Sequence, residues 1–98
     1  MADLRFEWDP SKDRANRRKH KVSFQEAESV FADEHARLLD EPEHSEAEDR
    51  SVLLGLSSRF RVLVVVHTYR GTEDTIRIIS ARRATKQERA YYDARWQR

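Results

Sequence analysis

The order of hydrophobic and polar positions near the N-terminus predicts a short strand followed by a helix. Phe6 and Trp8 alternate with polar neighbours, which is the period-two pattern of a strand. Asp9-Pro10 is typical of a helix N-cap followed by proline in the first turn, so we expect a helix from there to about His20. Because Ala15 is its one interior apolar residue, this helix should lie across a surface, packed through long Arg and Lys stems.

Two further helices are predicted by a repeated capping-box pattern, in which a Ser or Thr precedes a Glu by three residues. Residues 23–26 show this pattern, and the apolar positions that follow them lie at helical spacing: Phe24, Ala27, Val30 and Phe31. The chain should therefore break between the first two helices at Lys21-Val22. Residues 85–88 repeat the box and open a C-terminal helix that brings Tyr92 next to Trp96.

The region between these helices is rich in strand patterns. Strands are predicted at 51–56, 61–69 and 75–82, with a short one at 36–39, and the turns fall at 57–60 and 70–73. The fold class is therefore α+β, in one domain over residues 1–98. We expect an antiparallel sheet of about four to five strands, with two N-terminal helices packed on one face and a C-terminal helix.

Side-chain alternation separates the strand at 61–69 into two faces. One face is purely apolar (Val62, Val64 and Val66), and we expect it beneath the helices. The other mixes cationic, aromatic and aliphatic residues (Arg61, Leu63, Val65, His67 and Tyr69), and pairing would add either Arg77 or Arg82. Such a mixed face suits phosphate and base contacts, which makes it the candidate surface for binding or catalysis. Ordinary polar residues at the edge of the sheet, together with a contact to another subunit, explain the pattern equally well.

Composition narrows the class of protein. The 98 residues contain no Cys, which excludes disulfides and thiolate metal sites. The longest apolar run, residues 62–66, is far below the roughly 20 residues needed to span a bilayer, and the first residues are too acidic for a signal peptide. We therefore expect a small soluble cytoplasmic protein with no membrane association.

The formal net charge of +1 hides a strong segregation of charge. Residues 11–21 carry six bases against one acid, whereas residues 33–50 carry eight acids against two bases. Residues 59–83 add six arginines against two acids. A polarised molecule of this kind can hold a polyanion on one side, although solvated helix faces are the alternative for any one segment. The acidic stretch at 40–49 is most simply a solvated loop, or else a contact for a basic partner.

Motifs for metals and cofactors are missing from the sequence. The four histidines (His20, His35, His44 and His67) have no metal-site spacing, and two glycines cannot build a phosphate-cradling loop. We therefore expect no metal and no cofactor.

Both ends of the chain carry motifs that resemble the BrnT toxins. The opening motif is residues 6–10, Lys12, Asn16, Lys19-His20, 22–27 and Val30-Phe31, and the closing motif is residues 78–84 with Glu88, Arg89 and Tyr92. Residues 55–58 and 64–66 match the strands between. Lys21 departs from the family pattern, which usually places Gly there to end the helix in the left-handed conformation. We therefore expect Lys21 either to adopt a strained backbone conformation at the end of the first helix or to end that helix in a different way.

The resemblance implies a type II toxin with a RelE-like fold that cleaves RNA without a metal. It also implies inhibition by a co-encoded BrnA-type antitoxin with a ribbon-helix-helix part. The complex would repress its own operon, so operator DNA is an indirect partner through the antitoxin. A homodimer or heterotetramer is a further expectation.

Metal-free RNA cleavage needs a proton acceptor for the 2′-OH, cations for the charge growing on phosphorus and a proton donor for the leaving oxygen. Arg61 and Arg82 are our predictions for the cations, since guanidinium binds phosphate through two parallel hydrogen bonds. His20 or His67 could carry the proton, because imidazole titrates near neutral pH. Further RNA contacts are expected from the remaining basic and aromatic positions: Lys19, Arg77, Arg83, Tyr91 and Tyr92.

Two other classes of protein compete with the nuclease hypothesis. One is a nucleic-acid-binding regulator without catalysis, which would show salt-dependent RNA binding and no product. The other is an interaction protein whose Arg-rich face receives an acidic antitoxin segment.

Overall fold

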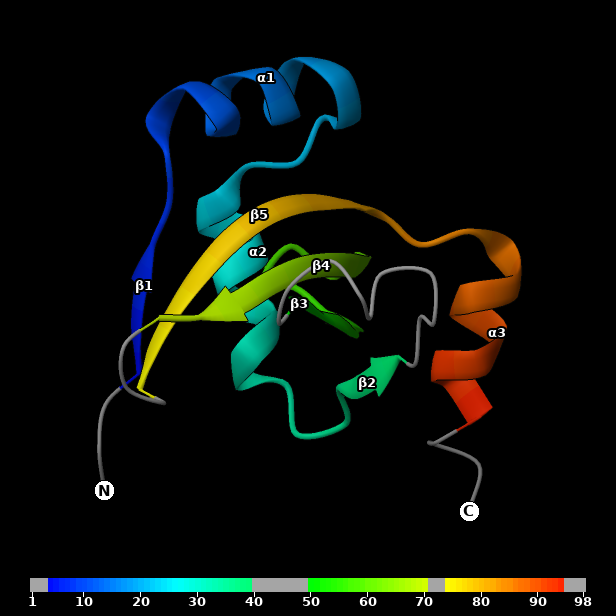
Figure 1. Ribbon diagram of the computed structural model, residues 1–98. Helices are drawn as coiled ribbons and strands as arrows, with labels where there is room; N and C mark the ends of the chain where they lie inside the picture. The colour runs from blue at the N-terminus through cyan, green and yellow to red at the C-terminus, as the bar shows by residue number, and fades with distance from the viewer. Residues whose placement is uncertain (1–3, 40–49, 71–73, 95–98) are drawn as a thin grey trace.

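Five strands form one mixed sheet in the computed structural model, which describes residues 4–39, 50–70 and 74–94 (Figure 1). The strands are β1 (Arg5–Glu7), β2 (Arg37–Leu39), β3 (Arg50–Leu56), β4 (Val62–Tyr69) and β5 (Thr75–Arg83). Their order across the sheet is β1-β5-β4-β3-β2. Strands β2 to β5 pair antiparallel, as predicted, but β1 pairs parallel with β5. The fully antiparallel prediction is therefore wrong at this edge, because the intervening helices and hairpins return β5 in the direction of β1.

The helix α1 (Pro10–His20) begins and ends near the predicted residues. Asp9 caps its start by accepting a hydrogen bond from the Ser11 N–H at 2.9 Å. At its end, Lys21 adopts the left-handed conformation (φ 62°, ψ 31°), and its N–H donates to the Arg17 carbonyl. Lys21 thus ends the helix in the left-handed conformation that a glycine would adopt at this position, although this conformation is unfavourable for a residue with a side chain.

The helix α2 (Phe24–Ser29) continues into a short 3₁₀ turn, η1 (Val30–Ala32). Ser23 accepts from the Glu26 N–H at 3.0 Å, as the capping box requires. The Glu26 carboxylate instead accepts hydrogen bonds from Ser57 and Arg61, so the second half of that predicted box is wrong. Tertiary partners 31 and 35 residues away compete successfully for this carboxylate.

The larger core lies between α2 and one face of the sheet. Phe24 and Val30 are fully buried there against Leu63 and Val65 of β4. We expected Val62, Val64 and Val66 beneath the helices, and they pack in the smaller core that includes Tyr92 of the C-terminal helix. The prediction that the mixed face is the open working surface is wrong, because Leu63 and Val65 of that face are buried beneath α2.

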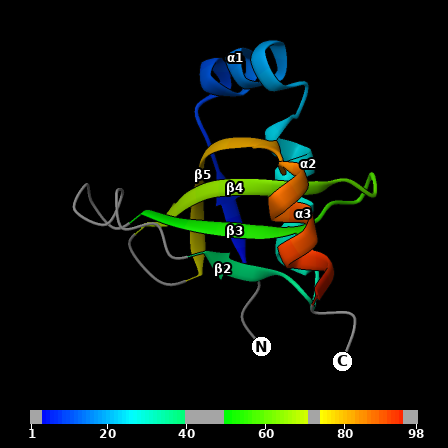
Figure 2. The ribbon, with the colours of Figure 1, turned by 90° about the vertical axis from the view of Figure 1, so that its right-hand side faces the viewer.

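The helix α3 (Lys86–Asp93) covers the opposite face of the sheet (Figure 2). Its Thr85–Glu88 capping box is complete, as predicted. Tyr92 is buried against Val52, Leu54 and Val64, and its hydroxyl donates to Asp33 at 2.6 Å. This contact holds α3 over β3 and β4. The predicted partner of Tyr92 on this helix, Trp96, and the acidic stretch at 40–49 lie outside the described residues.

A bulge in β5 decides which face its arginines occupy. Val66 pairs with Ser80, but the next residue, His67, pairs with Ile78, so Ile79 is an extra residue in β5. Strict alternation places Arg77 and Arg82 on opposite faces. With the bulge, Arg77 pairs beside Thr68 and Arg82 beside Val64, so both belong to the face that carries α3.

Candidate functional site

A hollow of about 240 Å³ lies where α1 ends beside the last residues of β5. His20 and Arg82 stand at its polar rim together with Ser80, and its floor is apolar: Val52, Val64, Val66 and Ala81. The sequence predicted His20 and Arg82 as site residues on separate grounds, and the fold brings them to one place. A cation and an imidazole over an apolar floor have the chemistry to bind and activate a phosphodiester.

Arg82 is held in the hollow by Glu88 from the first turn of α3. Its two terminal nitrogens donate to the two carboxylate oxygens of Glu88 at 2.8 and 2.9 Å. The same carboxylate accepts from the Thr85 N–H at 2.8 Å. The hydrogen bonds from Arg82, with help from Thr85, lower the pKa of Glu88 to about 2, so it is ionised at neutral pH. The Arg82 side chain remains 40% exposed and accessible from solvent.

Arg61, the other predicted phosphate ligand, lies on the opposite face of the sheet. Its guanidinium binds Glu26 through two nitrogens and donates to the Lys21 carbonyl at 3.0 Å. Burial raises the pKa of Glu26, but the hydrogen bonds from Arg61 and Ser57 outweigh burial, so the pKa is lowered overall. The structure therefore does not bring Arg61 and Arg82 together. Arg61 joins β4 to the α1–α2 junction.

His67 is fully buried, so the predicted position on an open working surface is wrong. Its ring makes edge contacts with Phe31 and Tyr69, at centroid distances of 4.8 and 5.7 Å. Its Nε2 has no hydrogen-bond partner within the described ranges, and burial lowers the pKa of the imidazole. A substrate phosphate cannot reach this ring, because α2 and η1 cover that face.

The two predicted tyrosines have different environments. Tyr92 is 2% exposed and belongs to the core beneath α3, so it has no face to stack on a base. Tyr91 is about half exposed, and the Arg37 guanidinium lies 3.8 Å from its ring centroid.

The remaining predicted RNA contacts separate into two groups. Arg77 binds Glu7 of the neighbouring strand at 3.2 Å, near the start of β5, whereas Arg82 is close to its end. Lys19 and Arg83 are exposed and lie next to the hollow in the chain, since Lys19 precedes His20 and Arg83 follows Arg82.

One residue essential to the position of the hollow was not singled out as functional by the sequence analysis. Asn16 is buried in α1, and its amide donates to the carbonyls of Val22 and Ala81 at 2.9 and 2.8 Å. It also accepts from the Ala81 N–H at 3.2 Å. These bonds fix α1 on β5 one residue from Arg82. The sequence feature that could have indicated this role is a single Asn in a helix that has no apolar face to pack on the sheet.

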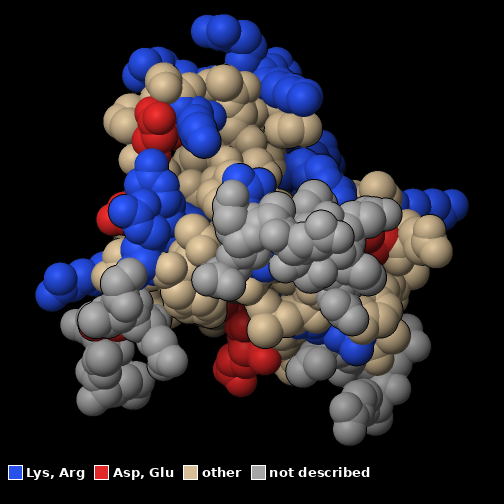
Figure 3. Space-filling view, in the orientation of Figure 1, with Lys and Arg blue, Asp and Glu red and all other residues tan. Residues whose placement is uncertain are grey.

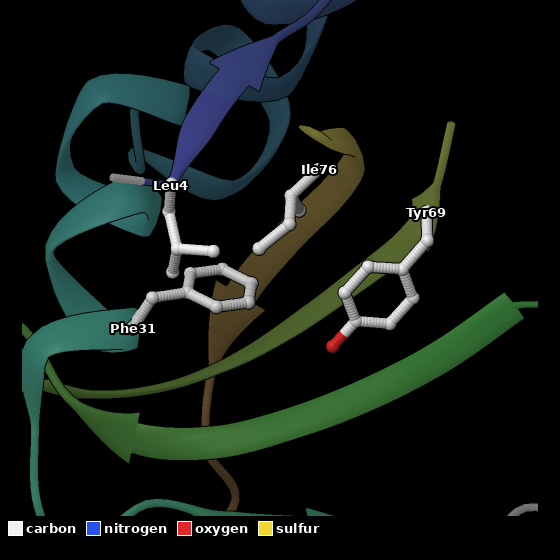
Figure 4. Close-up of a pocket in the computed structure, with 4 residues that line it drawn as sticks. All are labelled: Leu4, Phe31, Tyr69 and Ile76. Atoms are coloured by element: carbon white, nitrogen blue, oxygen red, sulfur yellow. The ribbon is translucent and has the colours of Figure 1, made fainter. Parts of the chain in front are cut away.

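A second, larger hollow of about 530 Å³ is chemically different. Leu4, Phe31, Tyr69 and Ile76 face one another around it (Figure 4). These side chains supply hydrocarbon and one phenol, and no cation or imidazole for phosphate chemistry. The hollow beside α1 is therefore the better candidate for catalysis.

The surface charge supports the same choice. Lys and Arg side chains gather over α1 at the top of the molecule (Figure 3).

Within residues 4–39, 50–70 and 74–94, no group of three His, Asp or Glu side chains could hold a metal ion. No helix in those ranges is long and apolar enough to cross a membrane.

A protein-family comparison identifies the relatives of this chain. The model of the BrnT family, described as the ribonuclease toxin of a type II toxin-antitoxin system, matches residues 8–88. The chain belongs to the BrnT family. The match includes α1, the four strands β2 to β5 and the start of α3, and therefore every residue that lines the hollow.

The fold agrees with that of a solved BrnT-family member. The chain is similar to the Brucella abortus ribonuclease toxin BrnT, known from a crystal structure at 1.1 Å resolution, with a TM-score of 0.65 and 21% sequence identity. The similarity covers 85% of this chain and 99% of the Brucella chain. At this identity the likeness shows a shared fold. No curated protein matches the sequence.

Proposed function

We propose that the chain is a single RelE-like toxin domain that cleaves RNA without a metal, as an endoribonuclease of the mRNA interferase type. Membership of the BrnT family supports the ribonuclease activity. The observation that carries the proposed site is that His20 and Arg82 line one hollow.

In this mechanism, the ribose 2′-oxygen attacks the adjacent phosphorus. A bond forms between the 2′-oxygen and phosphorus, and the bond from phosphorus to the 5′-oxygen breaks, leaving a 2′,3′-cyclic phosphate. Arg82 donates hydrogen bonds to the equatorial oxygens, where negative charge grows. His20 carries out one of the two proton transfers, either removal of the 2′-OH proton or protonation of the leaving 5′-oxygen, and water carries out the other.

The walls of the hollow assist this chemistry. The Val52, Val64 and Val66 side chains form an apolar floor that limits the access of water and strengthens the pairing between guanidinium and phosphate. Lys19 and Arg83 bind neighbouring phosphates. We assign Arg61 and His67 to the structure of the helix-covered face, and Tyr91 to a peripheral RNA contact.

Partners follow from the type II system. The antitoxin would be a BrnA-type protein that blocks the hollow and supplies ribbon-helix-helix elements for operator DNA. The toxin would form a homodimer, or a heterotetramer with the antitoxin, in the cytoplasm, and the complex would repress its operon.

The decisive experiment incubates the purified chain with total RNA, with and without EDTA. Cleavage that chelation leaves unchanged supports the proposal. Absence of product with a folded chain contradicts it, and salt-dependent binding without product would indicate a non-catalytic RNA-binding protein.

A pair of histidine variants tests the assignment of the proton carrier. His20→Ala should slow cleavage by roughly a hundredfold or more, the contribution expected of a general acid or base. His67→Leu is the matched control, because it removes the buried imidazole without touching the hollow, and it should cleave RNA at the wild-type rate. The reverse pattern would move the site to the face covered by α2.

A further inference from the structure

The outer surface of α1 is an exposed cationic surface, and Lys19 is the one residue of it that the proposed mechanism uses. Five of its side chains are basic and solvent-exposed: Lys12, Arg14, Arg17, Arg18 and Lys19. Its one acid, Asp13, lies 3.8 Å from Arg17 and also accepts a hydrogen bond from the Phe24 N–H. Among the described residues, Arg17 and Asp13 are the only charged pair on the helix, so most of this positive charge is not neutralised locally.

Packing does not explain this concentration of charge. Asn16 is the one buried residue of α1, and its hydrogen bonds to Val22 and Ala81 attach the helix to β5. A helix that packs through one amide gains little apolar burial, and its like charges repel one another. Its outer side is therefore available for a partner, which Figure 3 shows as the blue surface at the top of the molecule.

This surface is continuous with the proposed catalytic hollow. His20, the last residue of α1, lines the hollow, and Lys19 precedes it. From Lys12 to His20 the helix rises about 12 Å, at 1.5 Å per residue, which is long enough to contact more than one phosphate of a single strand.

We propose that the outer surface of α1 binds the sugar-phosphate backbone of the RNA beyond the cleaved bond. This inference rests on the proposed function, and it adds that the substrate is an extended RNA strand held on one side of the reacting phosphate. Flexible Lys and Arg side chains on one helix match a repeating phosphate charge, and they read no base edge. The surface therefore contributes affinity without sequence preference.

The test compares Arg14→Ala/Arg18→Ala with the matched control Arg5→Ala/Arg70→Ala. Both variants lose two exposed arginines, but Arg5 begins β1 and Arg70 follows β4, and both lie beside Thr75, away from the hollow. Cleavage is measured on an RNA of about 20 nucleotides and on a trinucleotide that spans only the cleaved bond. Binding of the long RNA, blocked by a 2′-deoxy substitution at the cleaved position, is measured against salt concentration.

The α1 variant should raise KM for the long RNA roughly tenfold, with kcat unchanged and no effect on the trinucleotide. Its salt slope should fall by about 1.4, since each phosphate contact on a single strand contributes about 0.7. The control should behave as the wild type. Equal effects of the two variants overturn the inference, and so does a loss of antitoxin affinity by the α1 variant without a change in RNA binding.

These outcomes are separate from the proposed catalysis. A wild-type chain that cleaves neither RNA contradicts the proposed function, while binding of the blocked RNA still decides whether α1 is the RNA-binding surface.

Discussion

Two arginines at the ends of neighbouring strands have the same kind of partner and opposite surroundings. Arg61 binds Glu26 on the face covered by α2, where the Glu26 side chain is 4% exposed. Arg82 binds Glu88 on the face covered by α3, where the glutamate is 24% exposed and the arginine 40%. The Arg61–Glu26 pair connects the start of β4 to α2, whereas the Arg82–Glu88 pair lies beside a hollow that is open to solvent.

The difference shows that an arginine–carboxylate pair does not reveal its own role. A buried pair that also binds the backbone, as Arg61 binds Lys21, is costly to break because it leaves an uncompensated charge. A half-exposed pair keeps the guanidinium ordered and reachable by an anion. Access from solvent, and not the contact itself, separates the two residues.

The largest expected effect is on catalysis and separates the two arginines directly. Arg82→Ala should reduce kcat by roughly a hundredfold or more, because it removes a cation from the transition state. Arg61→Ala should reduce stability more than kcat. Cleavage assays at a temperature where both variants are folded, checked by circular dichroism, measure this. If Arg82→Ala kept wild-type activity, or if Arg61→Ala lost as much kcat as Arg82→Ala, the arginine assignment would be wrong.

The next effect is on stability and compares the two glutamates. Glu26→Ala should lower the free energy of unfolding by about 3 kcal/mol, since it leaves Arg61 and Ser57 without their buried partner. Glu88→Ala should cost about 1 kcal/mol, because water replaces its exposed contacts. Urea denaturation of both variants provides the comparison. A larger loss of stability for Glu88→Ala than for Glu26→Ala would show that the contacts of α3 stabilise the fold more than those of α2.

A smaller effect is expected from pH. The pKa of Glu88 is lowered from 4.5 to about 2, so its ionised form binds Arg82 more strongly in the folded chain than in the unfolded chain. Its contribution to stability is therefore complete above pH 4.5 and is lost as the pH falls toward 2. Glu88→Gln should be less stable than the wild type at pH 6, and this gap should shrink between pH 4.5 and 2. A gap that stays constant with pH would contradict the ion pair.

The smallest effect concerns Lys21, which connects the two faces. Its carbonyl accepts from Arg61 on the closed face, and its left-handed backbone ends the helix that delivers His20 to the open one. Lys21→Gly should stabilise the fold by about 0.5 kcal/mol, since relief of the left-handed conformation exceeds the added entropy of the unfolded chain. Thermal unfolding measures this. A destabilised variant would mean that the Lys21 side chain contributes more than its backbone strain costs.

The helices and most strands could be predicted because their signals are local. Asp9 and Thr85 cap helices through neighbouring backbone groups, and both caps are confirmed. The sheet faces could not be predicted, because alternation along β4 does not say which side receives α2. His67 illustrates this, since an imidazole on a mixed strand face looks accessible in sequence but lies beneath Phe31.

The candidate site was predicted in part for the same reason. His20 and Arg82 were named from the sequence, but their meeting depends on Asn16, which ties α1 to Ala81, and on the bulge that turns Arg82 toward the hollow. Glu26 was assigned to a local cap, and the fold gives its carboxylate to Arg61 instead.

The sequence by itself determined the elements, the segregation of charge onto α1 and the family of the chain, since periodicity, capping residues and motifs act over a few positions. The tertiary structure alone decided which helix covers which face of the sheet, which arginine is held in a buried ion pair and which histidine is reachable. These depend on one extra residue in β5 and on hydrogen bonds between positions up to 65 residues apart. Local patterns carry no information about contacts at that separation, so only the folded chain distinguishes Arg82 from Arg61.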